Sequence, residues 1–120
     1  MGRAAVREYA AQQGEASRDI RALAVRYTLQ LLAEKATGNT LEVRVPPFGA
    51  VQCIEGPRHT RGTPPNVVEM DAATWLGLAT GREPWAVAVA EGRVAASGQR
   101  ADLTDYLPVI SEAAGSRIEP

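Results

Sequence analysis

The fold is decided by residues 66–108, NVVEMDAATWLGLATGREPWAVAVAEGRVAASGQRADLTDYLP. A short β-branched run opens this stretch and predicts a strand at Val67–Met70. Asp71 is placed to accept the unpaired N–H groups that begin a helix, and Gly81 can adopt the left-handed conformation that ends one. The sequence therefore predicts a strand followed directly by a capped helix that runs through Ala79.

The segment from Trp85 to Ser97 is compatible with two structures. Alternating apolar residues around a Glu-Gly pair favour a hairpin on pattern alone. Pro84 suits the first position of a helix, and the alanines that follow it are good helix formers. The second interpretation is therefore a helix from Pro84 to Ala90 and a strand over Arg93–Ser97.

A last short helix is expected after Gly98, with Asp102 as its N-cap. Leu103, Tyr106, Leu107 and Ile110 would share one of its faces. Pro108 falls inside this pattern, so we expect the helix to break or restart there.

The first forty residues have helical patterns. Residues 3–13 form either a short helix or a frayed arm, interrupted by Gly14. Ser17 is a good N-cap for a long helix over Arg18–Thr37, which Gly38 ends. Strict alternation then predicts a strand at Leu41–Val45, followed by a second at Ala50–Ile54 that pairs with it in antiparallel orientation.

Together these elements predict an α+β fold. We expect a mainly antiparallel sheet of four to five strands, covered by the long N-terminal helix and by the shorter later helices. A polar loop rich in Pro, Gly and Arg connects the second and third strands. The expected division is an N-terminal helical arm over residues 1–17, the domain itself over residues 18–112 and a frayed tail over residues 113–120.

Composition restricts the class of protein. The chain has 120 residues, 45% of them hydrophobic, which is enough for one domain with a single core. A net charge of −1 argues against nucleic-acid binding, and the small clusters Arg18/Arg21/Arg26 and Arg58/His59/Arg61 are expected to be solvated surface. No secretory signal and no run of about 18 apolar residues is evident. The expectation is a soluble cytoplasmic protein with no membrane span.

Residues suited to catalysis or metal binding are few. The chain contains one cysteine, Cys53, and one histidine, His59, which cannot supply a metal ligand set or a nucleophile with its base. Cys53 is expected to be a buried small hydrophobe. Asp71 and Asp102 stand where helix caps belong, so capping is favoured over catalysis. We therefore expect neither an enzyme nor a cofactor.

Apolar side chains supply the candidate ligand site. The later helices carry more apolar bulk than their attachment to a sheet needs, and part of it can line a cleft between sheet and helices. Ordinary core packing explains the same residues equally well. The candidate ligand-binding residues are Trp75, Leu76, Leu78, Trp85, Val87, Val89, Leu103 and Leu107.

The same stretch resembles the sterol carrier protein domain, and more narrowly its bacterial orthologues. The resemblance extends over Leu41–Ile110 and rests on an ordered series rather than on one motif. The matching residues are Asp71, Trp75, Leu78, Thr80, Gly81, Arg82, Pro84, Ala88, Gly92, Arg93, Val94, Ser97, Gly98, Ala101, Asp102, Leu103 and Leu107. The resemblance implies non-covalent binding or transfer of a sterol, fatty acyl or other lipid-like molecule, without a chemical step.

Two other functions stay open. Similar domains form the C-terminal part of mycothiol-dependent maleylpyruvate isomerase-like proteins, so the chain could complete the active site of a partner enzyme. Arg82 or the Arg58–Arg61 loop would then recognise an anionic group. The other alternative is an interaction module without a ligand, and a homodimer is compatible with each of these readings.

Overall fold

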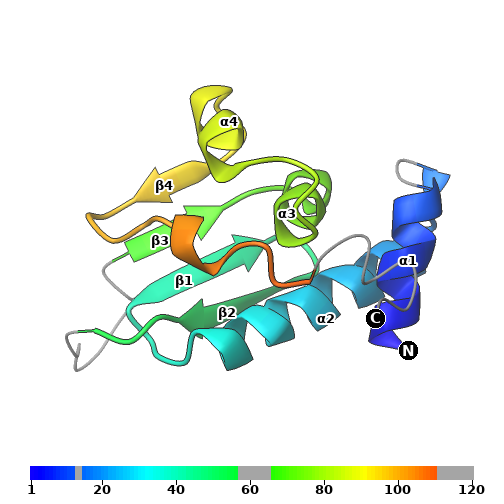
Figure 1. Ribbon diagram of the computed structural model, residues 1–120, viewed down its shortest axis with the longest axis horizontal. Helices are drawn as coiled ribbons and strands as arrows, with labels where there is room; N and C mark the ends of the chain where they lie inside the picture. Colours follow the sequence, from blue (N-terminus) through cyan, green and yellow to red (C-terminus); the bar gives the residue numbers. More distant parts are fainter. Residues whose placement is uncertain (13–14, 57–65, 111–120) are drawn as a thin grey trace, which may run out of the picture.

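The computed structural model describes residues 1–12, 15–56 and 66–110, and Figure 1 shows their arrangement. The Arg58/His59/Arg61 cluster and the tail expected at residues 113–120 lie outside this described part. The elements in chain order are α1 (Gly2–Gln12), α2 (Arg18–Lys35), β1 (Leu41–Val45), β2 (Gly49–Cys53), β3 (Asn66–Glu69), α3 (Ala72–Ala79), α4 (Trp85–Ala90), β4 (Ala95–Ser97) and the 3₁₀ turn η2 (Thr104–Tyr106). The α+β class is thus confirmed.

The sheet has four strands in the order β2–β1–β3–β4, and it is mixed. β1 pairs antiparallel with β2 but parallel with β3, while β3 and β4 are antiparallel. The prediction of a mainly antiparallel sheet is therefore wrong. The β1–β2 hairpin returns the chain to the start of β1, where Leu41 pairs with both Cys53 and Asn66. A strand that begins there and adds to the free edge of β1 has to run parallel to it.

Asn66 fixes this arrangement with its side chain. It is buried, its Nδ2 donates to the carbonyl oxygen of Thr40 at 3.0 Å, and its Oδ1 accepts from the backbone N–H of Arg100 at 2.9 Å. The amide thus joins the start of β1 to the segment that follows β4. The bond to Thr40 is buried, so it helps to hold the parallel pairing of β1 and β3 in register, while the bond from Arg100 is only partly buried.

The expectation of a long N-terminal helix is wrong in two respects: a short helix precedes the long one, and the long one ends at Lys35 rather than at Thr37. The N-terminal helix, α1, is only 11 residues long, and the long helix, α2 with 18 residues, is the second in the chain. Residues 2–12 are therefore helical and not a frayed arm. α1 packs on α2, with Val6 and Tyr9 buried and Gly2 against the ring of Tyr27. Ser17 caps α2 as predicted, accepting from the N–H of Ile20 at 3.2 Å.

One face of the sheet carries the core. Leu41, Val43 and Val45 of β1 are fully buried, whereas Glu42 and Arg44 between them are half-buried on the opposite face, as the alternation predicts. α2 packs against the buried face over β2, and α3 packs against α2. The core therefore lies between the sheet and a layer made by these two helices.

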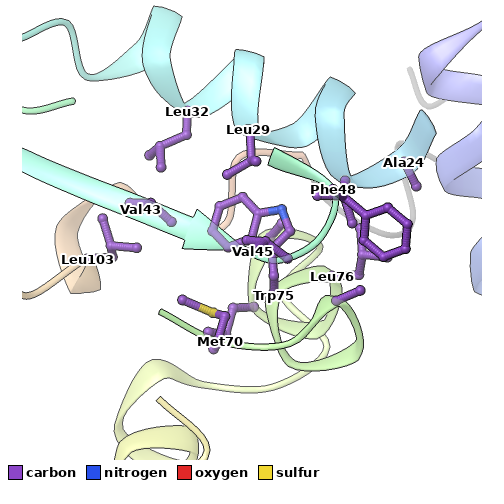
Figure 2. Packing of buried hydrophobic residues seen from close by; sticks show 14 of the residues in the cluster. Ala24, Leu29, Leu32, Val43, Val45, Phe48, Met70, Trp75, Leu76 and Leu103 are labelled. Carbon is purple, nitrogen blue, oxygen red and sulfur yellow. The ribbon is translucent and has the colours of Figure 1, made fainter. Parts of the chain in front are cut away.

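Trp75 is the largest side chain in this core and is completely buried. Figure 2 shows its indole reaching from α3 toward α2, among Leu29, Val45 and Met70. The indole nitrogen donates to Oγ1 of Thr28 at 2.8 Å, and that hydroxyl lies 2.7 Å from the carbonyl oxygen of Ala24, to which it donates. Since both polar groups are out of reach of water, each needs the other.

We predict that Thr28→Val destabilises the protein by about 1–3 kcal/mol, because it keeps the volume but leaves the indole N–H buried without an acceptor. Thr28→Ser retains the hydroxyl and should cost about 0.8 kcal/mol for one lost methyl group. Urea unfolding followed by circular dichroism measures both. A Val variant as stable as the Ser variant would contradict the importance of this hydrogen bond.

The predicted boundaries of α3 are confirmed. Asp71 has extended backbone angles and its Oδ1 accepts from the N–H of Thr74 at 2.8 Å. Gly81 follows the C-cap Thr80 with φ +81°, in the left-handed region. The helical interpretation of the next segment is also correct, because α4 is a helix and β4 follows it as an antiparallel strand.

The last predicted helix is wrong in extent. Only the three residues of η2 are helical, and Leu103 rather than Asp102 occupies the N-cap position. Asp102 instead accepts from the N–H of Thr104 at 2.8 Å, two residues along the chain. Pro108 cannot continue a helix, and this leaves room for a single turn before it.

Replacing Gly81 with Val should lower the free energy of unfolding by at least about 1 kcal/mol, because a β-branched residue is an outlier at positive φ. An added Cβ would also lie 3.3 Å from Cγ of Pro108. Gly92 provides a comparison, because it has φ +76° but nothing within 4 Å of an added Cβ. Thermal melts should rank wild type above Gly92→Val and Gly92→Val at or above Gly81→Val. A Gly81→Val protein that melts like wild type would show that α3 does not need its left-handed terminus.

Candidate functional site

An apolar pocket of about 320 Å³ lies where α3 ends and α4 begins. Its apolar lining residues are Leu78 from α3, Trp85 at the first position of α4 and Leu107 from the segment after η2. Its volume falls at the lower end of the range for small-molecule pockets, about 300–1,000 Å³. Backbone hydrogen bonds from Val109 and Ile110 to the carbonyl oxygen of Ala79, at 2.9 and 3.1 Å, hold the closing segment on α3.

The structure distributes the eight candidate ligand residues over three environments. Leu78, Trp85 and Leu107 line the apolar pocket. Trp75, Leu76 and Leu103 are fully buried among the residues of the core. Val87 and Val89 are 41% exposed on α4. Three of the eight residues therefore meet at one surface pocket, and three form the packed layer beneath the helices.

α4 is an apolar helix with little burial. Its sequence is WAVAVA, and only Ala88 is buried. Trp85 and Val89 are separated by four positions and share a face, whereas Val87 lies on the opposite side. Helical spacing therefore places Val89 on the face of α4 that carries Trp85, one turn further along, and places Val87 away from that face.

An ion-pair cluster holds the two ends of α4 together. Arg93 Nη1 donates to Glu83 Oε2 at 2.7 Å, and Arg93 Nη2 lies 2.6 Å from Oε1 of Glu91. Glu83 precedes the helix and Glu91 is its C-cap residue. The hydrogen bond from Arg93 lowers the pKa of Glu83 below its ordinary value, and the positive charge of Arg93 acts in the same direction. We call Glu83, Glu91 and Arg93 the α4 clamp.

We predict that Arg93→Gln releases α4, giving several-fold faster backbone amide exchange in residues 85–90 at neutral pH. Glu91→Gln removes only the more exposed partner and should have a smaller effect. Because the pKa of Glu83 in the folded state is lowered from 4.5, its contribution is present above that value and lost as the pH falls through the lowered pKa. Exchange protection of wild-type α4 should therefore decline in this acidic range, and a variant without Arg93 should show no such step. Equal protection in the two proteins at neutral pH would rule out the clamp.

Other reactive groups stand apart from this pocket. Cys53 is buried in β2, and burial raises the pKa of its thiol to about 11, so it is protonated at neutral pH. His59 lies outside the described residues. Within residues 1–12, 15–56 and 66–110, no group of three or more His, Cys, Asp or Glu side chains could hold a metal ion. The carboxylate of Asp102 accepts a hydrogen bond from Thr104 within a local turn, and this bond lowers the pKa of the carboxyl group.

Sequence reasoning missed two features that depend on distant residues. The α4 clamp joins Glu83 to a residue ten positions away, for which no helical or strand spacing exists. The cluster Arg18/Arg21/Arg26 was expected to be solvated, but Nε of Arg21 is buried. Arg18 lies over the ring of Phe48, 5.3 Å from its centroid, and Arg26 donates to the carbonyl oxygen of Phe48 at 3.1 Å. The prolines before Phe48 signal a turn there, but not that the turn meets α2.

Comparison with known protein families gives a match over most of the chain. The model of a family described as the bacterial SCP ortholog matches residues 17–109, a span that contains α2, the whole sheet, α3, α4 and the pocket. No curated protein sequence matches the chain. Among the described helices, none combines the length and apolar character needed to cross a membrane.

Proposed function

We propose that this chain, which belongs to the bacterial sterol carrier protein-like family, binds a lipid-like molecule. The general function of that family is lipid binding or carriage. The proposed ligand is a sterol, a fatty acyl group or another lipid-like molecule, and the proposed site is the apolar pocket beside α4. The observation that carries the proposal is that Trp85, which lines the pocket, begins a helix with exposed apolar side chains. Trp85 lines the pocket, and Val89 extends the same helix face outward. A molecule longer than the pocket can therefore keep its remaining apolar length in contact with protein.

The weak attachment of α4 allows this helix to move when a ligand enters the proposed site. α4 buries one side chain and is held at its ends by the α4 clamp, whose groups are partly exposed. Partly exposed ion pairs contribute little stability, so α4 can move at small cost while the core beneath it stays packed. We propose that α4 shifts outward to admit the ligand.

We propose that no chemical step follows binding. The residues lining the pocket are mainly apolar, and the charged residues among them are Arg82 and Glu83. Glu83 is engaged by Arg93, and Arg82 also has interactions of its own. The lining contains no Ser, Thr, Cys, Lys or His side chain to act as a nucleophile, which supports holding a molecule rather than transforming it.

The test is a titration with a neutral long-chain alcohol and with a sterol, followed by tryptophan emission. Trp75 is sealed in the core, so the expected blue shift comes from Trp85 and should disappear in Trp85→Phe. No change of emission with any member of a broad lipid panel would contradict the proposal.

Val87 and Val89 provide a matched pair of variants, since both are valines, both are 41% exposed and both lie on α4. Val89→Ser should weaken lipid binding about three- to tenfold, because it removes apolar contact next to Trp85. Val87→Ser should leave the affinity unchanged. Equal effects of the two substitutions would mean that the ligand does not lie along the Trp85 face.

An accessory subunit of an enzyme is the second candidate, and the exposed apolar side chains of α4 favour it, since exposed apolar surface marks protein interfaces as well as lipid sites. Native mass spectrometry of the freshly purified chain separates the two candidates. A co-purifying lipid supports the carrier, and a stable partner protein supports the subunit.

A further inference from the structure

A second pocket, of about 390 Å³, lies at the other end of α3. Its walls come from Tyr9 of α1, Arg18 and Arg21 near the start of α2, the turn at residues 46–48 and the first residues of α3. It shares no residue with the apolar pocket, because α3 contributes its first turn to one and its last residues to the other. We call it the arginine pocket.

The arginine pocket has an excess of positive charge. Its lining includes two arginines, Arg18 and Arg21, and one acidic residue, Asp71. Asp71 is already committed, since its Oδ1 accepts the N–H of Thr74 at 2.8 Å. A different pocket, beside Ile54, shows the opposite balance, with three carboxylates against Arg100. The excess of positive charge is therefore a property of this site and not of the surface in general.

Arg21 lines the arginine pocket from the first turns of α2. Its Nε is buried, and no described residue accepts a hydrogen bond from it. Because Arg21 is only partly buried, the rest of its side chain can line the pocket. A guanidinium group binds carboxylate or phosphate through two parallel hydrogen bonds, so the two arginines in the lining suit an oxyanion.

The backbone adds further donors. Asp71 caps only the N–H of Thr74, so the first two amides of α3, those of Ala72 and Ala73, have no acceptor within the helix. These residues line the arginine pocket, where the positive end of the helix dipole also favours an anion. Both the arginine side chains and the backbone amides at the start of α3 thus provide hydrogen-bond donors to the arginine pocket.

The remaining walls are flat and apolar. Figure 2 shows Phe48 beside α2, and Arg18 lies over its ring. Pro46, Pro47 and Tyr9 also line the pocket. From the donors and these walls together, we propose that the arginine pocket binds a small oxyanion, a carboxylate or a phosphate ester, attached to a flat apolar group.

The experiment uses the full chain, labelled with ¹⁵N, and two probes that carry different anionic groups on a phenyl ring. Phenyl phosphate carries a phosphate ester, and benzoate carries a carboxylate. Benzyl alcohol is the uncharged control. The expected result is a dissociation constant below about 1 mM for at least one oxyanion and at least about tenfold weaker binding of the alcohol. The amide signals of Ala72, Ala73 and Tyr9 should shift. Tighter binding of one probe assigns the site to phosphates or to carboxylates.

Arg18→Gln and Arg21→Gln should each weaken binding of that probe at least about tenfold, since each removes a charged donor. Arg3→Gln is the matched control, because it removes the same charge from an exposed position of α1 outside the pocket. Arg18 is exposed, so its variant should fold even if the Arg21 variant does not, and thermal melts check both.

Absence of binding by both oxyanions would overturn the proposal, as would equal binding to wild type and Arg18→Gln, or shifts confined to other parts of the chain. The result of this experiment does not depend on the proposed lipid binding. Neutral lipids test the apolar pocket, and short aromatic oxyanions test the arginine pocket.

Discussion

The buried hydrogen bond between the indole of Trp75 and the hydroxyl of Thr28 is the constraint on which the rest of the structure depends. It is 2.8 Å long and joins α3 to α2 in the middle of the core. A large side chain with a polar atom can occupy a core only where that atom finds a partner, so the bond determines how α3 lies on α2. The loss of such a side chain typically costs about 3–5 kcal/mol, a large part of the stability of a small domain.

Once α3 is fixed in this way, its two ends determine where ligands can bind. The helix buries seven of its eight residues, so no room for a ligand remains along its length. Space remains at its termini, which differ in chemistry. The first turn offers unpaired N–H groups beside Arg18 and Arg21, and the last residues meet Trp85 and Leu107. An oxyanion suits one end and an apolar molecule the other, and each proposal follows from that difference.

Local chemistry explains which parts of the site could be predicted. Asp71 as N-cap and Gly81 in the left-handed region follow from the requirements of helix ends alone, and both are confirmed. The pocket required more, because Leu78, Trp85 and Leu107 come from three segments that meet only after folding. Apolar character identified them together with Trp75, which the fold places in the core instead. Hydrophobicity does not distinguish a core residue from a pocket residue, since both avoid water.

The sequence by itself determined the α+β class, β1, the N-caps of α2 and α3 and the termination of α3, because each depends on periodicity or on one residue's backbone and hydrogen-bonding preferences. Tertiary structure alone decided the edge of β1 that β3 joins, the α4 clamp and the pocket that Arg21 and the start of α3 both line. Alternation in a strand specifies which side chains face the core but not the direction of the neighbouring strand, and ion pairs between distant residues leave no periodic signal. The mixed sheet and the two pockets thus arise from contacts that form only when the helices pack on the sheet.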